Sequence, residues 1–389
     1  MSKELGIADD ICARMVNWRH DLHAHPETAF EEHRTAQVVA DALMEMQISV
    51  HRGLGVTGVM GTLKNGEGPS IALRADMDAL NMQELGASPH KSSRDGKMHG
   101  CGHDGHTAML LGAAVHLARH RPFRGTVHFV FQPAEENEGG GKKMVDEGLF
   151  EKFPADAVYG MHNIPGIPRG KFAIRTGIAT AFLDTFEIEV TGKGCHAAAP
   201  ETGIDSIVIS AGLINALQSI VSRRIGAIEA AVVTVTQIHG GDTWNVVPEK
   251  VMMRGTVRTL DAGVQDRVEV AMKEVCAGFA QAHGATIDLR YMRGYPGVIN
   301  TPAETDAAAA AAMSLVGEDQ VMTDIKPAMG SEDFAFMLQK CPGAYICIGA
   351  GESPNDPPLH NPYYDFNDAI LPLGAAYWVE LVKQQLPAA

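Results

Sequence analysis

The sequence predicts an α/β protein in which a second, smaller domain interrupts the first. Short, mostly apolar runs alternate with helical stretches over the first 180 residues, which is the pattern of buried parallel strands. From about residue 180 the predicted order is strand, helix, strand, strand, helix, strand, the split βαβ unit of ferredoxin-like domains. The chain has 389 residues, which is enough for two domains of ordinary size.

Apolar spacing predicts each element of the first domain. Residues 10–47 carry helical spacing with a break near His25-Pro26. The predicted strands are Ile71–Ala75, Thr126–Gln132 and Ala157–Met161, and a helix is predicted at Thr107–His120. Asp104 is the expected N-cap of that helix. Cys101 and His103 then lie between a strand and a helix N-terminus, at the edge where open α/β sheets bind ligands.

The inserted domain is predicted to span residues 181–292. Its first strand alternates, with Phe186, Ile188 and Val190 on one face. The predicted elements of this domain are strand 182–190, helix 203–224, strands 230–238 and 250–260, helix 263–283 and strand 285–292. Residues 1–180 and 293–389 therefore form one discontinuous domain. Its last predicted elements are helix 302–316, a short helix from Ser331, strand 344–348 and helix 370–386.

Composition excludes several classes of function. A formal net charge of −15 argues against a nucleic-acid partner, because binding a phosphate backbone needs a basic face. The six cysteines are scattered without a CxxC pair, which fits a reducing compartment. The N-terminus has no secretory pattern, and no stretch approaches the ~20 apolar residues of a membrane span. We therefore expect a cytoplasmic protein that binds neither nucleic acid nor membranes.

The most informative segment is His-Gly-Cys-Gly-His-Asp-Gly-His at residues 99–106. It places the thiol of Cys101 and the imidazole of His103 two positions apart in glycine-rich backbone. Two adjacent carboxylates, Glu135 and Glu136, follow a later apolar run. Sulfur, nitrogen and oxygen donors together suit zinc, cobalt, nickel or manganese. One glutamate can hold metal while the other moves protons, so the sequence indicates a metal-dependent hydrolase.

Two further histidines lie in suggestive positions. His162 follows an apolar strand, and His360 lies in the proline-stiffened loop 357–362. Each candidate alone has an ordinary alternative: the chain has 17 histidines, a buried cysteine is usually a small apolar filler, and paired glutamates are usually solvated. Their shared position, at strand ends or helix starts on one edge of a sheet, favours a metal site.

Eight segments, in order, carry a resemblance that covers nearly the whole chain. They are Trp18–His23 with His25–Glu27, Leu73–Leu80, His99–Asp104, Gln132–Glu136, Gly160–His162, Gly192–Ala197, Trp244–Pro248 and Gly330–Phe334. The chain resembles the metallo-amidohydrolases that include hippurate hydrolase, N-acyl-amino-acid deacylases and auxin-conjugate hydrolases. These are relatives of the aminoacylase and carboxypeptidase-G-type zinc peptidases. The resemblance implies a mixed-sheet, metallopeptidase-like catalytic domain with an inserted ferredoxin-like dimerisation domain.

The resemblance also implies roles for the candidate residues. The implied metal ligands are Cys101, His103, Glu136, His162 and His360. They would hold two divalent ions (manganese, zinc, cobalt or nickel), with the cysteine sulfur as a candidate bridge. Glu135 matches the catalytic base, and Asp76 and Asp78 would orient ligand imidazoles. The alternative for the two aspartates is capping of the stretch that follows them.

The inserted domain is expected to complete the site. By resemblance, His196 acts on the oxyanion from the partner subunit, which predicts a homodimer, or alternatively a tetramer. The alternative is a turn histidine after a strand. Asn245 and Arg258 are expected to bind a substrate carboxylate, and Gly330 and Ser331 to supply donors nearby. The alternative for Arg258 is a surface position on its strand.

The expected reaction is hydrolysis of an N-acyl amino acid, such as a hippurate-like or N-acetyl conjugate, to a carboxylate and a free amino acid. Metal-activated water would attack the amide while Glu135 accepts its proton. A dipeptidase or an aminobenzoyl-glutamate hydrolase would use the same site. The non-enzyme alternative is a metal-stabilised scaffold, but a structural zinc site is closed and usually rich in thiolates.

Overall fold

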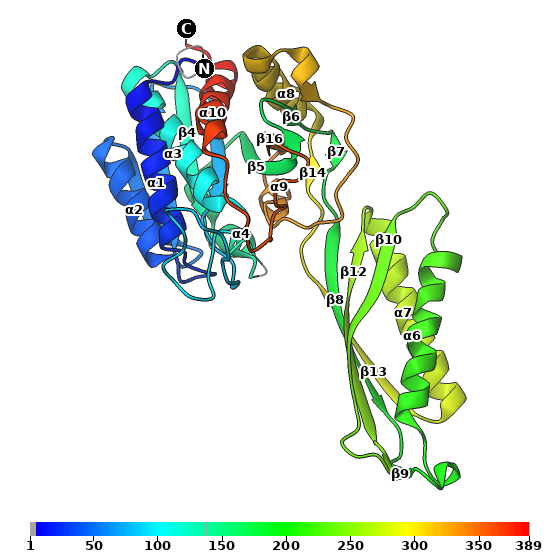
Figure 1. Ribbon diagram of the computed structural model, residues 1–389. Coiled ribbons are helices and arrows are strands. Elements are labelled where there is room, and N and C mark those ends of the chain that lie inside the picture. The colour runs from blue at the N-terminus through cyan, green and yellow to red at the C-terminus, as the bar shows by residue number, and fades with distance from the viewer. Residues whose placement is uncertain (1–4, 137, 389) are drawn as a thin grey trace. The chain divides into compact units, whose positions relative to one another are not determined.

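The computed structural model describes residues 5–136 and 138–388, which form two compact units (Figure 1). Unit 1 comprises the chain up to Ala179, Val298–Lys326, and the chain from Asp333 onward. Unit 2 comprises Thr180–Gly297 and Pro327–Glu332. The boundaries predicted at 180/181 and 292/293 therefore need correction, because 293–297 and 327–332 belong to unit 2. Backbone pairing explains both shifts: Gly294 N donates to Leu183 O, and Ala181 N donates to Gly330 O.

Unit 1 is built on a mixed eight-stranded sheet, which confirms the predicted fold class. In spatial order the strands are β1 (Ser49–Leu54), β2 (Gly58–Asn65), β4 (Gly125–Gln132), β3 (Ser70–Asp76), β5 (Ala157–Pro168), β16 (Gly343–Gly351), β6 (Phe172–Ala173) and β15 (Val321–Met322). The four central strands β4, β3, β5 and β16 run parallel, whereas β1 and β2 pair antiparallel. β1 was missed from the sequence because most of its side chains are exposed.

Helices cover both faces of this sheet (Figure 1). One face packs against α1 (Asp9–Ala24), α2 (His33–Glu45), α3 (His103–His120), α8 (Pro302–Val316) and α10 (Leu371–Gln385). The other face packs against α4 (Gly140–Asp146), α5 (Leu149–Lys152) and α9 (Ala335–Leu338). The short helix predicted from Ser331 thus begins only at Ala335. Strand β4 serves both layers, because Phe129 and Phe131 face the first core and Val130 faces the second.

Helix α3 begins differently from the prediction. Its N-cap is Gly102, which adopts a left-handed φ of 93° that side chains rarely tolerate. Asp104 lies inside the first turn instead, and its carboxylate accepts a hydrogen bond from the ring of His23 on α1 at 2.8 Å. The buried aspartate therefore joins two helices rather than capping one. The sharp turn at Gly102 places Cys101 and His103 on either side of the helix start.

Unit 2 is a four-stranded antiparallel sheet covered by two helices. Its sheet order is β10 (Ala231–His239), β12 (Lys250–Thr259), β8 (Phe182–Thr191) and β13 (Thr286–Arg293), with α6 (Ser206–Arg223) and α7 (Ala262–His283). The chain order βαββαβ and this pairing confirm the ferredoxin-like prediction. The side chains of Phe186, Ile188 and Val190 are buried as the alternation predicted.

Short ribbons and turns complete the two units. In unit 2, β9 (Cys195–His196) pairs antiparallel with β11 (Val246–Val247). In unit 1, β7 (Gly177–Ile178) pairs with β14 (Ile299–Asn300). Single 3₁₀ turns occupy Pro200–Thr202, Glu318–Gln320 and Asp368–Ile370.

Helix α6 is long and apolar enough by composition to cross a membrane. The sequence did not lead us to expect such a segment. Its Leu213, Leu217 and Ile220 lie in the core of unit 2, against the sheet and α7. The apolar composition is therefore explained by packing within this unit.

Candidate metal centre

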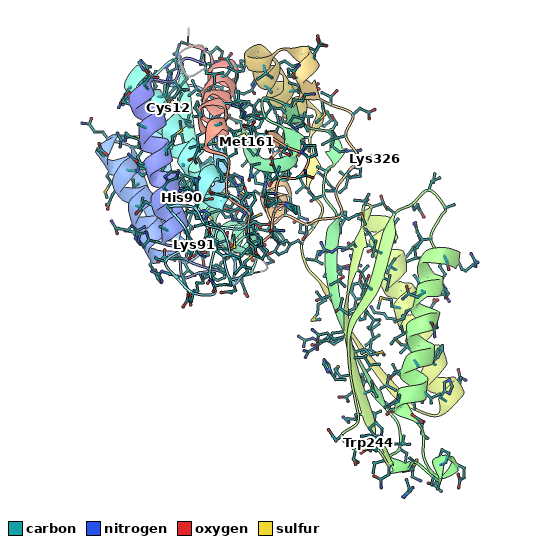
Figure 2. The ribbon with its side chains drawn as sticks, viewed as in Figure 1. Cys12, His90, Lys91, Met161, Trp244 and Lys326 are labelled. Atoms are coloured by element: carbon teal, nitrogen blue, oxygen red, sulfur yellow. The ribbon has the colours of Figure 1, made fainter. Side chains whose placement is uncertain are left out.

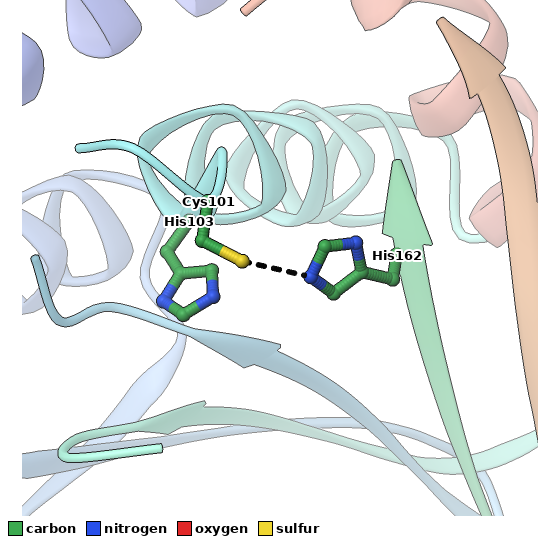
Figure 3. Close-up of side chains that lie close together, drawn as sticks. All are labelled: Cys101, His103 and His162. Carbon is green, nitrogen blue, oxygen red and sulfur yellow. Dashed lines mark hydrogen bonds between the residues drawn. The ribbon is translucent and has the colours of Figure 1, made fainter. Parts of the chain in front are cut away.

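Three buried side chains from two elements of unit 1 converge on one point (Figure 3). His103 is the first residue of α3 and Cys101 lies two positions before it. His162 lies on β5, directly after the Met161 that Figure 2 labels. One donor atom from each lies within 4.8 Å of the others. The Cys101 Sγ and the His162 Nε2 are 3.4 Å apart. The sulfur and the two ring nitrogens are thus arranged as a set of metal donors.

The second ring nitrogen of each histidine fixes which nitrogen faces the sulfur. His103 Nδ1 lies 3.0 Å from the carbonyl oxygen of Asp78, and His162 Nδ1 lies 2.7 Å from the carbonyl oxygen of Asn163. Each Nδ1 therefore carries a hydrogen and donates, so Nε2 is the ring nitrogen that each histidine can offer to a metal ion when it is deprotonated. The Nε2 of His103 is buried, and among the described residues it has no hydrogen-bond partner. A buried ring nitrogen close to a thiol is suited to a metal ion.

The same cysteine belongs to a second group of donors. Cys101, Glu136 and His360 also place one donor atom each within 4.8 Å of one another. His360 Nε2 lies 3.0 Å from Glu136 Oε1, and the His360 backbone amide donates to Gly100 O at 2.8 Å. Because Cys101 is common to both groups, the five side chains offer two adjoining sites with a shared sulfur.

The remaining glutamate lies beside these donors. Glu135 is 7 % exposed, and its carboxylate lies within 4.8 Å of donor atoms of His103 and Glu136. All five predicted ligands and the predicted base therefore come together in unit 1, although they come from four separate stretches of the chain. Glu135 is close enough to exchange a proton with a group held between the two sites.

The two aspartates after β3 differ in what they contact. The carbonyl oxygen and the Oδ1 of Asp78 lie 3.0 and 3.2 Å from His103 Nδ1. Asp76 instead hydrogen-bonds His106, with 2.6 Å between its Oδ1 and the ring Nδ1, and its approach to His103 is 3.7 Å. Asp76 thus lies beside one predicted ligand and hydrogen-bonds a neighbouring histidine. His106 in turn contacts Asn163, which follows His162.

Charge in this cluster favours a cation. Burial lowers the pKa of His103, but Asp76 and Cys101 outweigh that effect and raise it well above its usual value. Hydrogen bonds to Cys101 and Glu136 raise the pKa of His360 to about 10. Burial lowers the pKa of His162 well below its usual value, so this imidazole is a neutral donor. The anionic groups that favour the protonated forms of His103 and His360 would also attract a divalent ion. Binding of that ion would release the two protons.

The other candidates lie in unit 2. His196 and Asn245 are both exposed and adjoin one another across the β9–β11 ribbon, where Ala197 N donates to Asn245 O at 2.9 Å. Trp244, beside Asn245, is fully exposed (Figure 2). Arg258 is half-buried on β12, and its Nη1 lies 3.3 Å from both Met329 O and Ser331 Oγ. The carbonyl oxygen of Gly330 accepts a hydrogen bond from Ala181.

Several residues around the donors were missed from the sequence. Asn163 is fully buried and bridges His106 to the hydroxyl of Tyr364. Glu32 lies far from the donors in sequence, yet its carboxylate accepts a hydrogen bond from Ala134 N, next to Glu135. Asn163 adjoins a candidate ligand, which was the available signal. Glu32 carried none, because only the folded chain brings it to the glutamate pair.

Comparison with known proteins gives a consistent result. Residues 72–384 match the model of Peptidase family M20/M25/M40. Over 97 % of its length this chain is 41 % identical to hippurate hydrolase from Campylobacter jejuni, covering 98 % of that protein. It is 38 % identical to N-acetylcysteine deacetylase from Bacillus subtilis, over 95 % of this chain and 96 % of that protein.

A solved structure shares this architecture. The crystal structure of a dinuclear metal binding peptidase of the M20 family from Bacillus subtilis superposes with a TM-score of 0.84. The two chains are 34 % identical, and the match covers 96 % of this chain and 98 % of the other. The fold of this chain is therefore one that a solved member of the M20 family adopts.

Proposed function

Because this chain belongs to peptidase family M20/M25/M40, we propose that it is a metal-dependent amidohydrolase that cleaves N-acyl amino acids. The products would be a carboxylate and a free amino acid. Hippurate hydrolase and N-acetylcysteine deacetylase, its relatives, both carry names of this reaction type. The observation that carries the proposal is Cys101 shared between two groups of donors, with Glu135 beside them.

Five side chains would hold two divalent ions. One site would use His103 and His162, the other Glu136 and His360, with Cys101 common to both. Bound divalent ions polarise a scissile carbonyl and make water more acidic. Manganese, zinc, cobalt and nickel all suit a donor set of sulfur, nitrogen and oxygen. The solved M20 relative is dinuclear, which supports two ions here.

Glu135 would move the proton. Its carboxylate oxygen accepts the proton of the attacking water and later donates it to the nitrogen of the departing amine. Such a base is worth about 10²–10⁴ in rate. Asp78 holds His103 in the tautomer with a free Nε2, so it contributes by orienting a ligand.

Arg258 is our proposed receptor for the substrate carboxylate. Its Nη1 contacts two neutral oxygen atoms, Met329 O and Ser331 Oγ, and no carboxylate of the described residues pairs with it. Burial lowers the pKa of Arg258 without removing its charge at neutral pH. A half-buried guanidinium without an acidic partner favours a planar anion such as a carboxylate. Gly330 would complete this recognition within the same chain. Asn245 adjoins His196 at the opposite end of β12, so it would join the site from the second subunit together with His196.

We further propose that the protein works as a homodimer. His196 would donate to the developing oxyanion from the second subunit, which explains an exposed imidazole on a short ribbon beside Asn245. A reduced Cys101 is needed as a ligand, so a reducing compartment such as the cytoplasm suits this enzyme. A dipeptidase or aminobenzoyl-glutamate hydrolase activity would rest on the same residues.

The direct test is turnover by metal-reconstituted protein. Wild type should release amino acid from hippurate or N-acetyl amino acids in a panel that also contains dipeptides and aminobenzoyl-glutamate. Glu135→Gln should retain metal, measured by elemental analysis, and lose about 10²–10⁴ in kcat. If Glu135→Gln is as active as wild type, Glu135 is not the catalytic base. Hydrolysis of dipeptides alone would favour the dipeptidase, and folding lost on chelation without any turnover would favour a scaffold.

A further inference from the structure

A buried carboxylate outside the donor set supports the turn that carries the two glutamates. Glu32 is fully buried just before α2. Its Oε1 accepts hydrogen bonds from the backbone amides of Ala134 at 2.9 Å and Phe30 at 3.1 Å. Its Oε2 accepts one from the hydroxyl of Thr57, 2.5 Å away. The carboxylate thus joins the segment before α2, the turn between β1 and β2, and the end of β4.

The two backbone amides bound by Glu32 belong to unusual residues. Ala134 has a φ of 53° and Phe30 has a φ of 60°, so both are left-handed although neither is glycine. Side chains disfavour this region, and such residues persist only where surrounding contacts hold them. The acceptor that both share is the Glu32 carboxylate. Ala134 directly precedes Glu135, so the left-handed turn sets the direction in which the glutamate pair leaves β4.

A simpler role for Glu32 is excluded by the contacts of α2. Glu32 occupies the N-cap position of that helix, but its side chain makes no capping hydrogen bond. Glu27 does so instead, accepting from Arg34 N at 3.2 Å and Thr35 N at 2.8 Å. The carboxylate of Glu32 is thereby left to bind Ala134.

A second carboxylate, that of Asp78, binds the backbone directly after Glu135. Asp78 Oδ2 accepts a hydrogen bond from the backbone amide of Glu136 at 2.9 Å. The backbone amides that precede and follow Glu135 are therefore each bound by a buried carboxylate from another part of the chain. Asp78 also contacts His103, whereas the hydrogen bonds of the Glu32 side chain within the described chain go to Phe30, Thr57 and Ala134 and to no candidate ligand. Glu32 can therefore be altered without touching the donors.

We propose that Glu32 is a positioning residue for the catalytic glutamate: it holds Ala134 in its left-handed turn and thereby directs Glu135 at the two-site cluster. This inference rests on the proposed function, because Glu135 is the proposed base. Glu32 acts through the backbone and never contacts the substrate. The neutral side chain of glutamine can still accept from Ala134 through its carbonyl oxygen and donate to Thr57 through its amide, whereas alanine can do neither.

The test compares Glu32→Ala, Glu32→Gln and two controls with wild type. Glu32→Ala should lose at least about tenfold in kcat with KM changed less than about twofold, because an aligned base acts on the chemical step. Glu32→Gln should recover most of that loss. Glu27→Ala is the matched control, since it removes a buried carboxylate that caps α2 without touching Ala134. Glu31→Ala, at an exposed neighbouring position, should behave as wild type.

Coupling to the base can be measured directly. In a Glu135→Gln background, Glu32→Ala should cost less than about twofold further, because the group it positions is already gone. An equal loss in both backgrounds would overturn the proposal. So would wild-type kcat in folded Glu32→Ala, or an equal loss of kcat in Glu27→Ala. If Glu32→Ala does not fold, Thr57→Val removes one of the three donors to the carboxylate and should lower kcat in the same direction; an unchanged kcat would count against the proposal.

A structural readout separates this inference from the proposed function. In metal-free protein labelled with ¹⁵N-alanine, the Ala134 amide should exchange its hydrogen at least about tenfold faster in Glu32→Ala than in wild type, with Glu27→Ala as the control. Unchanged exchange would overturn the positioning role. If wild type hydrolyses no member of the substrate panel, the proposed function fails, and the exchange of Ala134 alone decides whether Glu32 holds the turn.

Discussion

At the scale of single residues, the role of each histidine in the site depends on the hydrogen bonds that its ring nitrogens make. His103 and His162 each donate Nδ1–H to a carbonyl oxygen, and for that reason both present Nε2 toward Cys101. His106, three positions after His103, has both ring nitrogens engaged, by Asp76 and Asn163. Within one motif, His103 is therefore a candidate metal ligand, whereas His106 makes hydrogen bonds to the residues around the ligands.

Burial of Glu32 leads us to expect that the free energy of unfolding depends on pH. Burial raises its pKa to about 7, although the hydrogen bond from Thr57 opposes the shift. The folded chain then binds more protons than the unfolded chain between about pH 4.5 and 7, so the free energy of unfolding contributed by this group falls as pH rises through that window. Relative to Glu32→Gln, metal-free wild type should lose about 3 kcal/mol between pH 4 and 8. Denaturant unfolding at each pH measures the difference, and a constant difference would contradict it.

At the scale of elements, the backbone turn at the start of α3 sets the positions of Cys101 and His103. Gly102 has a φ of 93°, and a Cβ there would lie 2.4 Å from Asn163 Oδ1 and 2.8 Å from the hydroxyl oxygen of Tyr364. Asn163 belongs to β5, next to His162. The helix start and the strand are therefore packed so closely that the backbone at this position needs glycine.

Gly102→Ala should accordingly destabilise the fold by about 3 kcal/mol, from left-handed strain plus overpacking. It should also reduce the metal content after reconstitution. Gly96→Ala is the control, because its φ of 73° is also left-handed but a Cβ there meets nothing within 4 Å. That variant should cost about 1–2 kcal/mol and keep its metal. Chemical denaturation and elemental analysis measure both effects, and equal metal content in the two variants would contradict the role of the close approach.

At the scale of the whole molecule, all five candidate ligands lie in unit 1, and unit 2 has a core of its own. Metal binding should therefore stabilise unit 1 alone. With free metal at 1,000 times its Kd, the gain is about 4 kcal/mol. Chelation should speed amide exchange in α3 and β5 and leave β8 and β12 unchanged. Hydrogen-exchange mass spectrometry with and without chelator measures this, and equal acceleration in both units would contradict it.

The proposed dimer makes a separate prediction. Glu135→Gln and His196→Ala homodimers should each be inactive. After equimolar mixing and reassembly, about half of the dimers are mixed, and each mixed dimer has one site with both residues intact. Activity should therefore return to about a quarter of wild type. If mixed dimers form, as shown by tagged subunits, and activity stays absent, His196 does not act from the second subunit.

Much of this architecture was readable from the chain. Helix 302–316 was correct because its alanine run favours a helix. The alternation of Phe186, Ile188 and Val190 was correct because apolar periodicity reports which face of a strand is buried. Strand β1 was not readable, since its side chains are largely exposed. The return of residues 327–332 to unit 2 was missed because it depends on backbone pairing of Ala328 with Thr180, just before β8.

The sequence by itself determined the donor atoms: a thiol, imidazoles and paired carboxylates, set at strand ends and a helix start. These follow from residue type and local periodicity, which are properties of short segments. Only the tertiary structure decided that Cys101 belongs to both donor groups, that Asp76 serves His106, and that Glu32 binds Ala134. Such contacts join residues that are tens to hundreds of positions apart in the chain. A local sequence pattern therefore cannot predict which buried side chains will contact one another.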